Sequence, residues 1–378
     1  MNFCTCETKL AVGDELRTSI EKISILVLAI LRVFVGAALA QSPNPILPGT
    51  KPPDGPSAWK PWIGEYASEA IPGTVGVVYV LSEKDGLIWI SERQGDARDA
   101  RYTVRAKFPE SIAPPKPAEG PKGFRLDFDS DGNRILVAGD IANRKRTLDV
   151  GAAQSIRIKP TRPIEELRTE ALGATPPKEE GSFRKSELVE MPTLDASIHL
   201  DIRYATSNDF LGTPVYSQAR AFLQHPAAEA LVRVQLKLKR LGYGLLIHDA
   251  YRPWYVTKIF WDATPPEGKI FVADPAQGSR HNRGCAVDLT LYDLGSGKPV
   301  EMPGTYDEMS PRSYPDYPGG TSLQRWHRDL LRRAMESEGF TVYEAEWWHF
   351  DYQDWKEYPI LNVPFENLGL HPAAGAAA

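Results

Sequence analysis

Two kinds of hydrophobic pattern divide the chain. Between residues 62 and 160, short alternating runs of apolar and polar residues are separated by turn signals such as Ser130-Asp131-Gly132-Asn133. Regularly spaced short strands of this kind are typical of a small antiparallel barrel or sandwich. The expected strands lie at residues 76–81, 86–90, 102–105, 124–128 and 134–137. The pattern therefore predicts a small all-β domain over residues 62–160.

Beyond residue 182, helical and strand patterns are mixed. Apolar residues three and four positions apart predict one helix over residues 226–240 and another over residues 322–338. Residues 198–204, 244–249 and 286–291 read instead as strands. This mixture predicts an α+β domain over residues 182–378, with a central antiparallel sheet and flanking helices.

The remaining segments are expected to be linkers and a signal peptide. A proline-rich linker is predicted over residues 41–61 and a second linker over residues 161–181. Residues 23–40 are strongly apolar, follow Lys22 and end in Ala38-Leu39-Ala40, which is the pattern of a cleaved signal peptide over residues 1–40. Acidic residues before this run and Arg32 within it depart from the pattern, and an uncleaved membrane anchor is the alternative. Cleavage would place the protein in the periplasm or outside the cell, without a membrane span.

Charge and cysteine content narrow the possible partners. The formal net charge of -5 offers no basic excess to neutralise phosphates, so nucleic acid is not expected to bind. After cleavage at residue 40, Cys285 would be the one remaining thiol and no intramolecular disulfide could form. Because Cys285 alternates with Val287 and Leu289, it is predicted to be a small core residue.

A first set of candidate metal ligands lies in residues 279–291. Asp288 alternates with apolar neighbours on a predicted strand and is therefore expected to point away from the core. His281 lies seven residues earlier, an odd separation that would place the two side chains on opposite faces of a straight strand. A turn at Gly284 is therefore needed to bring them together. The alternative is a polar loop with a surface histidine and an edge-strand aspartate.

A third ligand and a base are offered by Glu346-Trp347-Trp348-His349. Two histidines and one aspartate would leave the fourth position of a tetrahedral Zn²⁺ open for water, as catalytic sites do. Glu346 could then take a proton from that water. Residues three apart face opposite ways on a regular strand, so this interpretation requires a bulge or turn at Trp347-Trp348. The alternative is a surface pair flanking two core tryptophans.

Several stretches together resemble one family, the zinc D-alanyl-D-alanine dipeptidases that include the vancomycin-resistance enzymes. The resemblance runs from about residue 198 to residue 364. It rests on the stretches 201–212 and 242–253, on Ser-x-His-x-x-Gly-x-Ala-x-Asp at 279–288, and on Glu-Trp-Trp-His at 346–349. The third pattern is shared by a wider peptidase clan, whereas its pairing with Asp-Ala-Tyr-Arg-Pro at 249–253 and Glu-Trp-Trp-His is specific to the dipeptidases. Asn282 and Cys285 replace residues that are often serine.

Carried over by motif position, the resemblance implies a role for each matching residue. It implies zinc ligands at His281, Asp288 and His349, a general base at Glu346, a transition-state arginine at Arg252, an amine-binding aspartate at Asp307, and substrate-lining residues at Ser279 and Tyr204. It further implies one Zn²⁺ per chain and a small D,D-dipeptide as substrate. The preceding β region is similar, at Trp62-Ile63-Gly64-Glu65-Tyr66, to accessory domains of secreted bacterial hydrolases.

The expected function is hydrolysis of D-alanyl-D-alanine to two molecules of D-alanine. One alternative is a D,D-carboxypeptidase of the same clan, which would act on longer peptidoglycan peptides. Another is a zinc-bearing module that binds cell-wall peptides without hydrolysing them. The presence of both Glu346 and Arg252 argues against a module without catalysis, because a guanidinium beside the metal would stabilise the oxyanion of a hydrolytic transition state.

Overall fold

The computed structural model describes residues 44–68, 77–94, 101–108, 118–119, 123–146 and 157–369 of the 378-residue chain. The predicted signal peptide lies outside these residues. Within the described ranges, no helix has both the length and the apolar composition needed to cross a membrane.

An eight-stranded antiparallel sheet is built from the first half of the chain. Its strands follow the order β4-β3-β2-β1-β8-β7-β6-β5. Their bounds are β1 (Gly64–Ala67), β2 (Val78–Lys84), β3 (Leu87–Gln94), β4 (Arg101–Phe108), β5 (Ala118–Glu119), β6 (Phe124–Phe128), β7 (Arg134–Ala138) and β8 (Ile141–Lys145). Each of the five predicted strands overlaps an observed one.

One apolar core joins the two halves of this sheet. Leu81, Ile88 and Phe108 from β2, β3 and β4 belong to the same buried cluster as Leu126 and Leu136 from β6 and β7. The sheet therefore curls around a shared core, as the alternating pattern predicts. Trp59 and Trp62 also belong to the cluster, so the end of the proline-rich segment is packed although its described residues form no helix or strand. That this region is a separate accessory domain stays a prediction.

The segment 161–181, predicted to be a linker, contains the helix α2 (Ile164–Gly173). Ile164, Leu167 and Ala171 are buried on one side of it, and α2 packs against α5 (Trp254–Ala263). The prediction missed this helix because three small or aliphatic residues among charged ones give a weak periodic signal.

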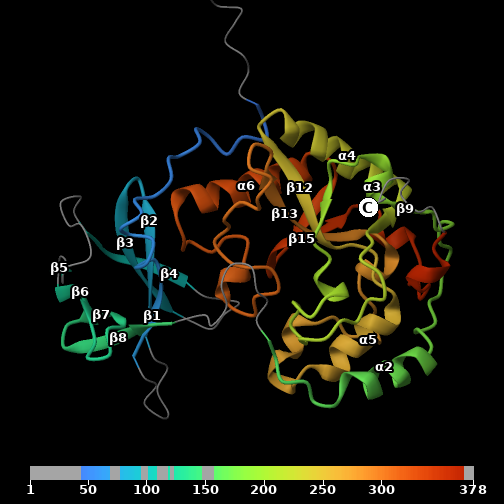
Figure 1. Ribbon diagram of the computed structural model, residues 1–378, viewed down its shortest axis with the longest axis horizontal. Helices are drawn as coiled ribbons and strands as arrows, with labels where there is room; N and C mark the ends of the chain where they lie inside the picture. The colour runs from blue at the N-terminus through green and yellow to red at the C-terminus, as the bar shows by residue number, and fades with distance from the viewer. Residues whose placement is uncertain are drawn as a thin grey trace, which may run out of the picture. The chain divides into compact units, whose positions relative to one another are not determined.

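The second half of the chain contains a five-stranded sheet (Figure 1). Its order is β10 (His199–Leu200), β12 (Tyr243–Asp249), β13 (Ala286–Asp293), β15 (Glu346–Tyr352) and β14 (Phe340–Tyr343). All neighbouring pairs are antiparallel except β10 with β12. The strand predicted over 198–204 is wrong in length, because the chain leaves the sheet after Leu200 and forms a 3-10 turn at Arg203–Ala205.

Two long helices pack against this sheet and against each other: α4 (His225–Lys239) and α6 (Ser322–Glu336). Helix α4 buries Leu231, Val234 and Leu238, the residues whose spacing predicts it. Helix α6 begins at a capping box in which Thr321 and Gln324 satisfy each other's backbone N–H groups. Shorter elements are β9 (Leu188–Glu190), α3 (Met191–Leu194) and β11 (Phe222–Gln224), of which β9 and β11 pair. The mixed α/β architecture agrees with the predicted α+β domain.

Candidate active site

The turn between the first two candidate ligands forms as the spacing requires. His281–Arg283 is a 3-10 turn that ends at Gly284 with φ 68° and ψ 24°, and β13 begins two residues later. A side chain at Gly284 would be strained by this left-handed backbone, and its Cβ would come within 2.5 Å of Leu188 Cδ2. Glycine is therefore required here, and the prediction of a turn at this position is confirmed.

The bulge required between Glu346 and His349 is also present. Along β14 and β15 the pairing moves from Val342 with Phe350 to Tyr343 with Glu346, so β15 has extra residues at this point. As a result, Glu346 Oε2 lies 3.7 Å from His349 Nδ1. On the other side of β15, His349 is directly paired with Asp288 of β13.

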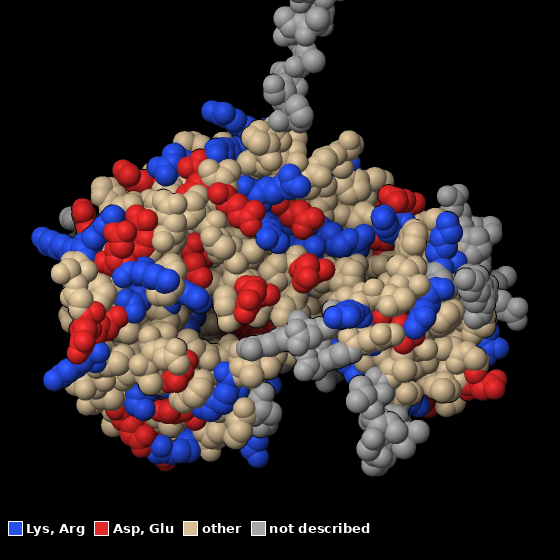
Figure 2. All heavy atoms as spheres, turned by 180° about the vertical axis from the view of Figure 1, so that it is seen from behind, with Lys and Arg blue, Asp and Glu red and all other residues tan. Residues whose placement is uncertain are grey.

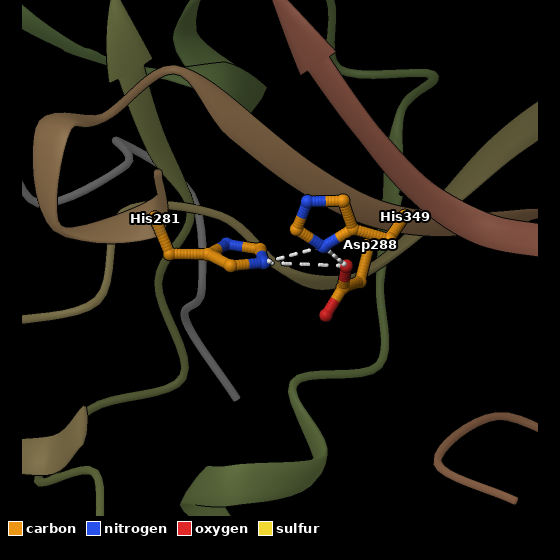
Figure 3. Close-up of side chains that lie close together, drawn as sticks. All are labelled: His281, Asp288 and His349. Carbon is orange, nitrogen blue, oxygen red and sulfur yellow. Dashed lines mark hydrogen bonds and ion pairs between the residues drawn. The ribbon is translucent and has the colours of Figure 1, made fainter. Parts of the chain in front are cut away.

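The three candidate ligands converge on one point (Figure 3). His281 Nε2 lies 3.1 Å from His349 Nδ1, and Asp288 Oδ1 lies 3.3 Å from the first nitrogen and 3.0 Å from the second. A tetrahedral zinc ion with bonds of about 2.0 Å would hold its ligand atoms roughly 3.3 Å apart. The observed separations therefore suit a metal ion at the centre of the group.

The hydrogen bonding of Asp288 supplies an independent test of this fit. Tyr306 donates to Asp288 Oδ2 at 3.1 Å, whereas the buried Oδ1 has no hydrogen-bond partner among the described residues. An unsatisfied buried carboxylate oxygen is costly unless a cation compensates it. Asp288 is only 3% exposed, so the expectation that it points away from the core is wrong in one respect: the second face of β13 is covered as well.

Hydrogen bonds outside the group fix which nitrogen of each histidine is available. His281 Nδ1 lies 2.7 Å from the carbonyl oxygen of Ala250, and His349 Nε2 lies 2.9 Å from Asp351 Oδ1. Because both partners are acceptors, these nitrogens carry protons, and His281 Nε2 and His349 Nδ1 remain for a metal. Sequence reasoning missed Asp351, although its place two residues after His349 on one strand offered a signal.

Replacing Asp351 by asparagine is expected to weaken metal affinity by about 10–100-fold, the usual effect of removing a carboxylate that orients a histidine ligand. Competition with a chromophoric chelator measures this affinity directly. Asp354→Asn makes the same chemical change three residues later, where the carboxylate pairs with Arg184, and should leave the affinity unaltered. Equal affinities for the Asp351 variant and the unmodified protein would contradict the assignment.

Without a metal, an extra proton on His349 would compensate the negative charge of Asp288 and Asp351. Burial lowers the pKa of His349, but the adjacent carboxylates of Asp288 and Asp351 outweigh this effect and raise the pKa to about 10. Burial also acts to raise the pKa of Asp288, yet the His281 and His349 imidazoles hold it well below its usual range. A metal ion would replace the extra proton on His349, so binding must release protons.

Glu346 is placed to accept a proton beside the group. Its side chain is 20% exposed and lines the same cavity as the three candidate ligands. Burial raises its pKa to about 7, with the Asp288 charge acting in the same direction and His349 against it. A carboxylate with a pKa near neutrality suits general acid and base catalysis.

Arg252 pairs with Asp249 in the interior of the protein. Asp249 is fully buried, and its Oδ2 accepts hydrogen bonds from Arg252 Nε at 3.0 Å and Nη2 at 2.7 Å. Tyr216 donates to the other oxygen of Asp249 at 2.6 Å. The guanidinium also stacks on the ring of Phe260, 4.8 Å from its centroid. Arg252 is thus held rigidly in the wall of the cavity.

Asp307 and Tyr204 form a second polar group in the cavity wall. The Tyr204 hydroxyl donates to the Asp307 carboxylate, with distances of 2.9 and 3.1 Å to its two oxygens. Asp307 has a φ of 57°, an uncommon conformation that aspartate tolerates better than most residues. Burial and the negative charge of Asp288 raise the pKa of Asp307 well above its usual range. A ligand ammonium would compensate this carboxylate.

Ser279 is positioned by the turn that carries His281. Its hydroxyl accepts a hydrogen bond from His281 N at 3.2 Å, and its own N–H donates to Asn282 Oδ1 at 2.7 Å. Asn282 also donates to the carbonyl oxygen of Arg252 and to Thr257 Oγ1, both at 2.8 Å. Asn282 therefore ties the two motifs together, a function that sequence reasoning did not assign to it.

One cavity of about 740 Å³ collects every predicted site residue. Its lining includes Tyr204, Arg252, Ser279, His281, Asp288, Asp307, Glu346 and His349. Cys285 does not line it: the residue is fully buried, as predicted, and burial raises the pKa of its thiol to about 12. A thiol in this environment is a core residue and not a nucleophile.

The antiparallel sheet presents two imidazoles and a carboxylate, with a glutamate and an arginine beside them. Metal-dependent peptidases use groups of these kinds. A family model described as D-ala-D-ala dipeptidase matches residues 184–367. The chain belongs to this family of peptidases.

Three relatives named D-alanyl-D-alanine dipeptidase support the assignment. The Escherichia coli protein is 34% identical over 180 residues, which cover 48% of this chain and 92% of that protein. The Enterococcus faecalis protein is 36% identical over 187 residues, with 44% and 92% covered. The Streptomyces coelicolor protein is 34% identical over 191 residues, with 46% and 93% covered. The similarity thus covers nearly half of this chain and nearly all of each relative.

Proposed function

We propose that the protein hydrolyses D-alanyl-D-alanine to two molecules of D-alanine with one Zn²⁺ held by His281, Asp288 and His349. The observation that carries the proposal is the convergence of three ligand atoms within 3.3 Å of one another in a cavity also lined by Glu346 and Arg252. The names of the relatives support the substrate. Two nitrogen ligands and one oxygen ligand suit zinc and leave a position for water.

The residues of the chain divide the chemistry among them. Bound zinc would supply Lewis-acid activation of water and of the substrate carbonyl. Glu346 takes the proton of the attacking water and passes it to the leaving amine. Arg252 donates hydrogen bonds to the carbonyl oxygen as negative charge develops on it, while Asp249 holds the guanidinium in place.

Recognition of the substrate amine falls to Asp307 in this proposal. Its carboxylate and the Tyr204 hydroxyl form one polar wall of the cavity, and a dipeptide ammonium would supply the missing positive charge. Ser279 lines the cavity next to His281 and contacts the substrate backbone.

A D,D-carboxypeptidase is the second candidate, because the cavity extends to residues 269–274 and is larger than D-alanyl-D-alanine needs. The two activities differ in their tolerance of a blocked amine, since Asp307 would be left without an ammonium partner by an N-acylated peptide. A strong preference for N-acetyl-D-alanyl-D-alanine over the free dipeptide would favour the carboxypeptidase.

The cellular setting is also part of the proposal. The apolar run at residues 23–40 supports export to the periplasm or the medium, and the sheet of β1 to β8 would act as an accessory domain. Acidic and basic side chains are interspersed on the face shown in Figure 2.

Metal content and turnover test the proposed function together. The purified protein should contain about one zinc per chain, release D-alanine from D-alanyl-D-alanine, lose turnover on chelation and recover it with added Zn²⁺. Elemental analysis and a D-alanine assay measure both quantities. Full activity in a metal-free preparation would overturn the proposal.

A further inference from the structure

The side chain of Arg280 lies in the wall of the cavity. Arg280 follows Ser279 and precedes His281, and its side chain is 37% exposed. Its guanidinium carbon lies 5.1 Å from the ring centre of Trp355 and 5.5 Å from that of Tyr343. All three residues line the cavity that contains the metal ligands. Two aromatic rings thus hold a cation at the cavity wall.

The carboxylate of Asp351 links this guanidinium to the metal group. Asp351 Oδ1 lies 2.9 Å from His349 Nε2, and Asp351 Oδ2 lies 3.2 Å from Arg280 Nε. The ion pair engages Nε, whereas the two terminal nitrogens of Arg280 have no hydrogen-bond acceptor among the residues that the structure describes. A guanidinium held in this way can present a fork of donors to a ligand.

Each other cation of the cavity already donates to an acceptor within the protein. Arg252 donates to Asp249, Arg283 donates to Glu179 and to the carbonyl oxygen of Tyr358, and Lys269 donates to the carbonyl oxygen of Trp261. Because Arg252 is assigned to the substrate carbonyl oxygen, Arg280 is the cation among the described cavity-lining residues that is best placed to bind a carboxylate.

We propose that Arg280 binds the C-terminal carboxylate of the substrate. The inference rests on the proposed dipeptidase function and names a specificity-determining residue for it. A free dipeptide carries one charge of each sign, and the cavity offers one group for each: Asp307 beside Tyr204, and Arg280 beside Asp351. Tyr306 packs against Tyr204 and donates to Asp288, whereas Asp351 contacts His349. The metal ligands therefore lie between the two charged groups, and the scissile bond of a substrate that spans them would lie at the metal.

Comparing a free carboxylate with a neutral amide tests this assignment. The substrates are D-alanyl-D-alanine and D-alanyl-D-alaninamide, which share the scissile bond and the free amine. The unmodified zinc enzyme should prefer the free acid. In Arg280→Gln, KM for the acid should rise about 10–100-fold, the value of lost hydrogen bonds to a charged group, with kcat and zinc content little changed. The preference for the acid over the amide should disappear.

Two further variants serve as controls for a general loss of structure. Arg280→Lys keeps the charge but not the fork, and should give an intermediate preference for the acid. Lys356→Gln removes an exposed cation on Trp355 that does not line the cavity, and should behave as the unmodified enzyme. Thermal melting of each zinc-loaded variant reports whether it is folded.

The outcomes separate this inference from the function on which it rests. If the unmodified zinc enzyme hydrolyses neither substrate, the proposed function and the role of Arg280 both fall. If it hydrolyses the acid and the amide alike, or if folded Arg280→Gln keeps the full preference for the acid, the role of Arg280 is wrong and the dipeptidase function stands.

Discussion

Replacing Glu346 by glutamine is expected to lower kcat by about 10²–10⁴-fold while zinc stays bound, because this is the usual contribution of a positioned general acid and base. Glutamine keeps the size and hydrogen-bonding capacity of the side chain but cannot accept the proton of water. The three ligand atoms converge without Glu346, whose nearest oxygen is 3.7 Å from His349 Nδ1. Steady-state kinetics and elemental analysis of the same preparation check both parts.

Glu344→Gln is the matched control for this variant. Glu344 lies two residues earlier on an exposed turn and does not line the cavity, so its replacement should leave kcat unchanged. Near-normal turnover in zinc-loaded Glu346→Gln would show that another group moves the proton, and the proposed mechanism would then be wrong.

Local spacing showed which distortions the three candidate ligands would need in order to meet, whereas the choice of a metal site over surface residues rested on the family resemblance. The odd separation of His281 and Asp288 demanded a turn, and only Gly284 could supply it; the structure has its φ at 68°. The three-residue separation of Glu346 and His349 demanded an irregular strand, and the pairing of β14 with β15 shifts at that point. In both cases the spacing of the two residues did not fit the two-residue period of a regular strand, and this mismatch showed where the backbone must turn or bulge.

The residues that support the ligands could not be found in the same way. Ala250 contributes only a backbone carbonyl oxygen to His281, and any residue type could do so. Tyr306 reaches Asp288 from a loop 18 residues away in the sequence, and Asn282 joins two motifs 30 residues apart. These contacts depend on how loops fold over the sheet, which hydrophobic periodicity does not specify.

The alternating pattern also gave a wrong expectation of how far the residues of β13 are buried. Alternation along β13 gives two faces, and an antiparallel sheet often exposes one of them. Here every residue from Ala286 to Tyr292 is buried, because the helices cover one face and the loops that build the cavity cover the other. The covered polar face is what places Asp288 in a site from which bulk water is largely excluded, where its charge interacts strongly with its partners.

Replacing His349 by alanine is expected to abolish both metal binding and turnover, since two remaining ligands hold zinc poorly. The loss of affinity should exceed the roughly 10–100-fold expected for Asp351→Asn, which removes only a partner of this histidine. Asp288 Oδ1 would also lose the nitrogen that lies 3.0 Å from it.

Thermal melting with and without added zinc gives a readout that does not depend on activity. A ligand that binds only the folded state raises its stability, so zinc should raise the Tm of the unmodified protein and of Glu346→Gln, but not that of His349→Ala. His225→Ala, which removes a half-exposed imidazole on α4, should keep the zinc-dependent shift. A zinc-dependent rise in the Tm of His349→Ala equal to that of the unmodified protein would show that the metal is held elsewhere. Because Glu346→Gln and His349→Ala are both expected to be inactive, their different response to zinc separates loss of the base from loss of the metal.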